Sequence, residues 1–158
     1  MPTIEGVGPD AATITHPNGA KESECFYALD VIPNVVTLVA LDVPSNLSAA
    51  RSAICDWLRR PETNSAHLAL HPLLDEIAVR LGHDGNRALA LLEVGRVLAG
   101  GEVKYGDDRN WRGLHWRQHL RHALAHLVAD AAGDRSEGEI GHPTRAFCRI
   151  AFAIEVGS

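Results

Sequence analysis

Residues 115–131 read HWRQHLRHALAHLVADA, and this stretch decides the fold class. Its large apolar side chains recur three or four positions apart, at Leu120, Leu124 and Leu127, and continue at Val128. This spacing places them on one face of an amphipathic helix, and that face needs other elements to bury it. We therefore expect a helix over about residues 115–131 that packs against neighbouring helices.

Four other segments carry the same helical periodicity. They are residues 46–60, ended by Pro61; residues 72–81, ended by Gly82; residues 86–98, which turn Leu91, Val94 and Leu98 inward and precede Gly100 and Gly101; and a last segment that starts near Pro143. Proline suits the first turn of a helix and glycine its end, so these residues mark helix boundaries. We expect an all-α fold, a helical bundle of about four to five helices joined by short loops.

The N-terminal part of the chain has a different character. Residues 1–24 are rich in Gly, Pro, Thr and Asn and show no periodicity, so we expect an irregular N-terminal arm. Residues 25–158 are expected to form a single helical domain. Residues 26–41 are apolar and β-branched, and they fit a buried strand or a buried helix equally well, with a boundary at Pro33.

Composition limits the classes of function. The chain has 158 residues, of which 46% are hydrophobic and 22% charged, as expected for a soluble globular domain. Its net charge of −5 argues against a nucleic-acid-binding protein. Three dispersed cysteines without a C-x-x-C pair predict a reduced, cytoplasmic protein. Neither a signal peptide nor a run of ~20 apolar residues is present, so no membrane association is expected.

Four histidines lie on one face of the 115–131 helix, at His115, His119, His122 and His126. Imidazoles four residues apart on a helix can share one divalent metal ion. A solvated polar stripe is the alternative, because the leucines occupy another face of the same helix. The spacing alone does not choose between these two readings.

Acidic residues form a second group with chemical potential. Glu93 lies in the 86–98 helix, and Asp130, Asp134, Glu137 and Glu139 follow near the end of the histidine helix. Carboxylates from neighbouring helices can hold a hard cation such as Mg²⁺ around a polyphosphate. The alternative for Glu93 is an exposed position on an amphipathic helix.

Residues 104–112, KYGDDRNWR, combine cations, a turn and two aromatic side chains. Lysine and arginine can bind phosphate oxygens, and Tyr105 or Trp111 can stack on a base. The alternative is an ordinary charged loop in which Trp111 closes the end of the bundle.

Several short segments resemble one known family, the phage and bacterial dATP/dGTP diphosphohydrolases (MazZ-type), which are grouped with the all-α MazG-like nucleotide pyrophosphohydrolases. The segments are Leu91-Leu92-Glu93-Val94, Lys104-Tyr105-Gly106, Asn110-Trp111-Arg112, Arg121-His122, the spacing from His142 to Glu155, and an N-terminal stretch with Gly19, Lys21, Ser23, Asp30, Ile32 and Pro33. The resemblance covers residues 16–34 and 88–157, so residues 35–87 are expected to be an insertion or an added helical layer.

The resemblance implies an enzyme that uses Mg²⁺ or Mn²⁺ to hydrolyse a purine deoxynucleoside triphosphate to the monophosphate and pyrophosphate. It also implies a homo-oligomer, a dimer or tetramer. The metal-binding residues it implies are Glu93, His122, Asp134, Glu137 and His142, with Glu93 or Glu137 as the general base. The substrate-binding residues it implies are Lys21, Ser23, Lys104, Tyr105, Asn110, Trp111, Arg112 and Arg121.

Two positions depart from the family pattern. Arg117 stands where the family commonly has aspartate, and Arg145 stands where it has a second late histidine. These departures motivate an alternative, a nucleotide-binding or regulatory protein that has lost catalysis. A third reading is a helical interaction module whose histidine stripe senses pH or binds a transition metal.

Overall fold

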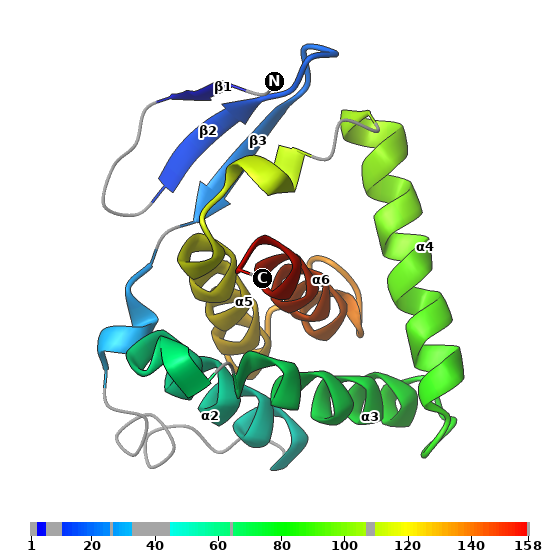
Figure 1. The fold of residues 1–158 in the computed structure, drawn as a ribbon. Helices are drawn as coiled ribbons and strands as arrows, with labels where there is room; N and C mark the ends of the chain where they lie inside the picture. The colour runs from blue at the N-terminus through cyan, green and yellow to red at the C-terminus, as the bar shows by residue number, and fades with distance from the viewer. Residues whose placement is uncertain are drawn as a thin grey trace.

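The computed structural model describes residues 3–5, 11–25, 27–32, 45–63, 65–106 and 110–157 (Figure 1). Within these residues the chain forms five α-helices: α2 (Ser45–Arg59), α3 (Leu70–Arg80), α4 (Arg87–Tyr105), α5 (Trp116–Ala131) and α6 (Gly141–Gly157). Short 3-10 helices lie at η1 (Leu29–Val31), η2 (Pro61–Thr63), η3 (Ser65–Ala69) and η4 (Asn110–Gly113). The predicted all-α helical bundle is confirmed.

Helices α5 and α6 lie side by side at the centre of the molecule, and α2 and α3 pack across them (Figure 1). The apolar periodicity predicted for these helices becomes the core, because Ile54, Ile77, Leu120 and Ile150 are completely buried. Helices α2 and α3 belong to the segment expected to be an insertion, yet their side chains make up a large part of this core. Burial of this kind is the main stabilising term in folding.

Helix α4 differs from its sequence prediction in length and in burial. It continues past Gly100 and Gly101 to Tyr105, because a helix tolerates an internal glycine at a cost of only ~1 kcal/mol. Of the three side chains expected inside, Val94 is buried, but Leu91 is 52% and Leu98 39% exposed. The reason is that α4 stands at the edge of the bundle, where α3 and α6 pack against part of its surface (Figure 1).

The N-terminal arm contains a small antiparallel sheet where the sequence analysis expected only loop. Strands β1 (Thr3–Glu5), β2 (Ala11–Thr15) and β3 (Lys21–Cys25) pair in chain order. These strands have only three to five residues, too few to show a clear alternation of apolar and polar side chains. Ile14 of β2 is buried, and it lines the cavity between the sheet and the helices.

Most of the apolar stretch 26–41 lies outside the described residues, so neither reading of it is tested. Its described part forms η1, which brings Asp30 into a buried position against α5. The Asp30 carboxylate accepts a hydrogen bond from Arg121 Nε at 2.9 Å, and Arg117 Nη1 lies 3.8 Å from it. Arg117, one of the two departures from the family pattern, therefore helps to hold η1 on the bundle.

Candidate active site

A cavity of about 820 Å³ lies between the C-terminal half of α4, the α5–α6 pair and the N-terminal sheet. Three cationic side chains line it, Lys104 from α4 and Arg145 and Arg149 from α6, together with the carboxylates of Glu22, Glu102 and Glu137. Trp111 and Phe152 form part of its apolar wall, and their rings stack at 4.5 Å between centroids. A cavity of this size with cations and an aromatic wall suits an anionic ligand that carries a flat ring.

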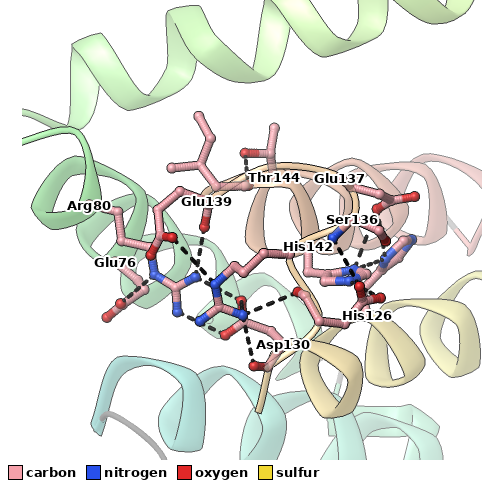
Figure 2. Close-up of polar contacts among 12 residues, drawn as sticks. Glu76, Arg80, His126, Asp130, Ser136, Glu137, Glu139, His142 and Thr144 are labelled. Atoms are coloured by element: carbon pink, nitrogen blue, oxygen red, sulfur yellow. Dashed lines mark hydrogen bonds and ion pairs between the residues drawn. The ribbon is translucent and has the colours of Figure 1, made fainter. Parts of the chain in front are cut away.

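Three potential metal ligands meet at one end of this cavity (Figure 2). His126 comes from α5, His142 from the first turn of α6, and Glu137 from the connection between them. His126 Nδ1 lies 2.9 Å from His142 Nδ1, and Glu137 Oε2 lies 3.8 Å from the first nitrogen and 3.4 Å from the second. His126 and Glu137 also line the cavity, so the group faces the space where a ligand would bind.

The packing of α5 on α6 brings these side chains together. The connection between the two helices turns back on itself at Gly133 and Gly138, whose φ angles of 87° and 92° favour glycine. At the start of α6, Gly141 lies so close to the turn that an added Cβ would be 2.7 Å from Glu137 Cβ. The close approach of Glu137 to α6 therefore depends on a glycine at position 141.

Each of the two imidazoles has a further partner on its other nitrogen. His142 Nε2 lies 3.0 Å from Asp134 Oδ2, and His126 Nε2 lies 3.0 Å from His122 Nε2. The hydrogen bond from the Ser136 backbone N–H, with help from His142, lowers the pKa of Asp134 to about 2. Asp134 is therefore ionised at neutral pH and accepts the His142 Nε2 proton, which leaves Nδ1 of His142 as a lone-pair donor.

His126 is neutral in this setting. Burial is the main cause that lowers its pKa to about 2, and the nearby charges of His122 and Arg149 act in the same direction. A neutral imidazole is the form that binds metal ions. At neutral pH His126 can therefore bind a metal ion without first losing a proton.

The four histidines of the predicted stripe have different roles in the structure: two stabilise the fold, and two face the metal-ligand group. His115 caps α5, since its Nδ1 accepts a hydrogen bond from the backbone N–H of Arg117. His119 is completely buried, and its Nε2 lies 2.8 Å from the carbonyl oxygen of Trp111. Only His122 and His126, the second half of the stripe, turn toward the metal-ligand group.

Glu93, predicted to bind metal and act as a base, lies outside this group. Its carboxylate forms an ion pair with Arg96 at 2.7 Å and is 19% exposed. Glu93 is four residues before Val97 and eleven before Lys104, both of which line the cavity, so it lies on the same face of α4 one turn beyond the cavity edge. The structure thus places Glu93 near the cavity but not at its metal-ligand end.

The substrate-binding residues implied by the resemblance are spread over several places. Lys104 and Trp111 line the cavity, but Arg121 is held by Asp30 and Arg112 lies 3.5 Å from Glu155. Arg112 also stacks over the Trp111 ring, 4.6 Å from its centroid. Lys21 is exposed on β3, and the side chains of Ser23, Tyr105 and Asn110 lie outside what the structure describes.

Sequence reasoning missed three side chains that the structure places at the cavity. His126 was considered only within the stripe, although its spacing of four from His122 already placed the two together. Arg145 and Arg149 are also four residues apart and present one cationic face of α6 to the cavity. Arg145 is the second departure from the family pattern. Its Nη1 lies 3.4 Å from Glu137 Oε2, so it is the cavity arginine that contacts the metal-ligand group.

Residues 81–157 match the model of the family described as dATP/dGTP diphosphohydrolase, N-terminal. Neither the curated proteins nor the solved structures contain a significant match to this chain. None of the helices in the described parts of the chain is both long and apolar enough to cross a membrane.

Proposed function

We propose that this protein hydrolyses a purine deoxynucleoside triphosphate to the monophosphate and pyrophosphate. The proposal starts from the match of residues 81–157 to the model of the dATP/dGTP diphosphohydrolase family. One observation carries the proposal: the cavity that Lys104, Arg145 and Arg149 help to line has His126, Glu137 and His142 at one end. Phosphoanhydride hydrolysis needs these two features together, a site for a polyanion and a centre that activates water.

The cationic wall would bind the triphosphate. Lys104, Arg145 and Arg149 approach the cavity from two helices, and together they oppose the negative charge of the phosphates. Arginine binds phosphate oxygens through paired N–H donors, and lysine does so as a point charge. The apolar wall at Trp111 and Phe152 would offer the base a surface.

The donor atoms at the end of the cavity fit a divalent cation. Two imidazole nitrogens and a carboxylate oxygen lie within 4.8 Å of one another, and Mg²⁺ or Mn²⁺ is the ion implied by the resemblance. A divalent cation bound there would neutralise phosphate charge and lower the pKa of a water molecule. His122 and Asp134 would orient the two imidazoles, since each contacts the outer nitrogen of one of them.

Glu137 is the better placed of the two candidate bases. Its carboxylate lies on the cavity wall and is 35% exposed, so its second oxygen, Oε1, can accept a proton from a water molecule that attacks the phosphate. Glu93 would have to reach the site along the face of α4 that it shares with Val97 and Lys104. We propose Glu137 as the base and keep Glu93 as the second candidate.

A second function is favoured by one observation. The Arg145 guanidinium lies 3.4 Å from Glu137 Oε2, and a cation at this distance can compete with a metal ion for the carboxylate. The protein would then bind nucleotides in the same cavity without cleaving them. This alternative predicts stabilisation by nucleotides without release of pyrophosphate.

The test is hydrolysis of the eight common ribo- and deoxyribonucleoside triphosphates by metal-stripped protein, with and without added Mg²⁺ or Mn²⁺. The expected products are a monophosphate and pyrophosphate, formed from purine deoxynucleotides only when metal is present. Glu137→Gln should lower kcat by at least about 100-fold. Glu139→Gln is the matched control, because Glu139 lies on the same connection but is 66% exposed and pairs with Arg135.

Each outcome of this test points to a different reading. Loss of activity in Glu93→Gln but not in Glu137→Gln would assign the base to α4 and overturn our choice of Glu137. Thermal stabilisation by nucleotides with no product at any metal would overturn catalysis and favour the binding protein.

We also propose that the protein forms a homodimer or a tetramer through α4. Leu92 and Val103 on this helix are 72% and 88% exposed, and Leu91 adds a further apolar side chain. Apolar side chains gathered on one exposed helix commonly mark a subunit interface. Light scattering coupled to size exclusion should give a mass above that of one chain, and Leu92→Glu should lower it. A monomeric wild type would contradict this proposal.

A further inference from the structure

The metal-ligand group has the dimensions of a site for one ion. The three pairs of donor atoms among His126, Glu137 and His142 are 2.9, 3.4 and 3.8 Å apart. Ligands that bind one metal ion at ~2.1 Å in tetrahedral directions lie about 3.4 Å from one another. Among the described residues, this is the one set of three histidine, cysteine or acidic side chains with donor atoms within 4.8 Å of each other.

The contacts around the group select the nitrogen that faces inward. Asp134 accepts the Nε2 proton of His142, in the carboxylate–histidine arrangement that commonly supports metal ligands. On the other side, His122 Nε2 lies at hydrogen-bond distance from His126 Nε2 and can accept its proton. Both Nδ1 atoms then present lone pairs to the same point, where Glu137 adds a negative charge. A bound cation satisfies all three donors at once.

The chemistry of these donors separates two classes of metal ion. Mg²⁺ prefers oxygen ligands in a near-octahedral arrangement and retains its water molecules. Two imidazoles and one carboxylate instead suit transition metals such as Mn²⁺, Co²⁺ and Zn²⁺, with an affinity that rises along that series. His126 accounts for this difference, since it supplies the second nitrogen ligand.

We propose that His126, Glu137 and His142 form a transition-metal site that discriminates against Mg²⁺, with further coordination positions open to the cavity. Openness follows from the position of His126 and Glu137 on the cavity wall. The inference rests on the proposed function only for the use of the ion in hydrolysis, because binding itself follows from the donor set. It also makes His126 a ligand of the same ion that the nucleotide phosphates would meet.

The experiment measures metal binding to the whole chain, without a nucleotide. Chelator-treated protein is titrated with Co²⁺, Zn²⁺ and Mg²⁺ by calorimetry, and the visible d–d absorption of Co²⁺ reports the ligand geometry. We expect one Co²⁺ or Zn²⁺ per chain and no measurable heat with Mg²⁺. His126→Gln should weaken Co²⁺ binding at least about 100-fold and change the absorption spectrum.

Two further variants make the test specific. Asp134→Asn keeps all three ligands but removes the charge that orients His142, so Co²⁺ affinity should fall about ten-fold. Asp134 is 43% exposed, which makes this variant safe for the fold. His83→Gln is the control, because His83 is an exposed histidine outside the group and its loss should change nothing.

Failure of this inference differs from failure of the proposed function. Mg²⁺ binding as tight as that of Co²⁺, or unchanged Co²⁺ binding in His126→Gln, would overturn the transition-metal site even if nucleotides are hydrolysed. Co²⁺ binding that responds to His126→Gln and Asp134→Asn would support the site even if no nucleotide is cleaved.

Discussion

Arg80 on α3 and Asp130 on α5 form a two-pronged ion pair, with Nη1 2.7 Å from Oδ1 and Nη2 2.8 Å from Oδ2 (Figure 2). Arg80 also donates to Glu76 and to the carbonyl oxygen of Glu139, in the connection that carries Glu137. The hydrogen bond that Arg80 donates to Asp130 is the main cause that raises the pKa of Arg80. One guanidinium, whose side chain is only 9% exposed, therefore links α3, α5 and the connection that carries Glu137.

Loss of this pair should destabilise the protein strongly. In Arg80→Met the Asp130 carboxylate stays buried without its main partner, and removal of one member of a buried pair costs about 3 kcal/mol or more in the free energy of unfolding. Urea unfolding measures this change. Arg87→Met is the matched control, because its pair with Asp75 is exposed to solvent and contributes much less. Equal effects of the two substitutions would contradict a structural role for Arg80.

The glycine at the start of α6 allows a second prediction. A Cβ at position 141 would lie 2.7 Å from Glu137 Cβ, so Gly141→Ala should push Glu137 away from His142. We expect destabilisation by about 1–3 kcal/mol, as for other overpacked sites, and weaker Co²⁺ binding in the same calorimetric titration. Gly95→Ala is the control, since a Cβ there meets open space within α4 and should stabilise the helix by about 0.5–1 kcal/mol. Unchanged metal affinity in Gly141→Ala would show that the connection adapts freely.

The helices that could be predicted from sequence are those whose apolar faces are buried. Leu120 and Leu124 in α5, like Ile54 in α2, fill the core. Their helical spacing in the sequence therefore indicates the face of each helix that packs inward. Helix α4 lacks this relation, because much of its apolar surface is exposed. Its apolar spacing therefore does not show where the helix ends, and the prediction relied on Gly100 and Gly101 as an end signal, although the helix continues through both.

The site could be predicted only in part, because its parts are distant in the sequence. His142 and Glu137 were found through the family motif, whereas His126 was found only as one member of the histidine stripe, which does not indicate that it meets the other two. Arg80 precedes the matched segment 81–157, and Asp130 is 50 residues away from it along the chain. Periodicity reports which face a residue occupies on its own helix, but not which residue of another helix it meets.

The two arginines Arg149 and Arg121 give a third prediction. Arg149 lines the cavity, where its Nη2 lies 3.7 Å from Glu22 Oε1, another lining residue. Arg121 instead donates a hydrogen bond to the buried Asp30 at 2.9 Å. Arg149→Met should raise the KM for the nucleotide about ten-fold with a smaller change in kcat, because a charge-assisted hydrogen bond contributes about 1.5–3 kcal/mol. Arg121→Met should leave KM unchanged and lower the unfolding midpoint in urea. The opposite result would assign the phosphate contact to Arg121, as the resemblance implies.

The thiol of Cys148 gives a prediction about pH. Cys148 lies on α6 at the cavity wall, and burial raises its pKa to about 11 although Arg149 and Arg145 act in the opposite direction. The thiolate is the form that reacts with iodoacetamide, so at pH 8 native Cys148 should react about two orders of magnitude more slowly than in urea, where a cysteine has a pKa of about 8.5. Mass spectrometry of the tryptic peptide that ends at Arg149 measures the rate for this cysteine alone.

The sign of the pH dependence follows from the raised pKa. The folded state keeps Cys148 protonated, so its contribution to stability is complete below about pH 8.5 and declines as the pH rises toward 11, because the unfolded chain ionises first. The native alkylation rate should therefore increase about ten-fold per pH unit between pH 8 and 10. A nucleoside triphosphate in the cavity should slow the reaction further by covering the thiol. Rapid labelling at pH 8, or a rate independent of pH, would contradict the burial of Cys148. A labelling rate that a bound nucleotide leaves unchanged would contradict its position on the wall of the nucleotide site.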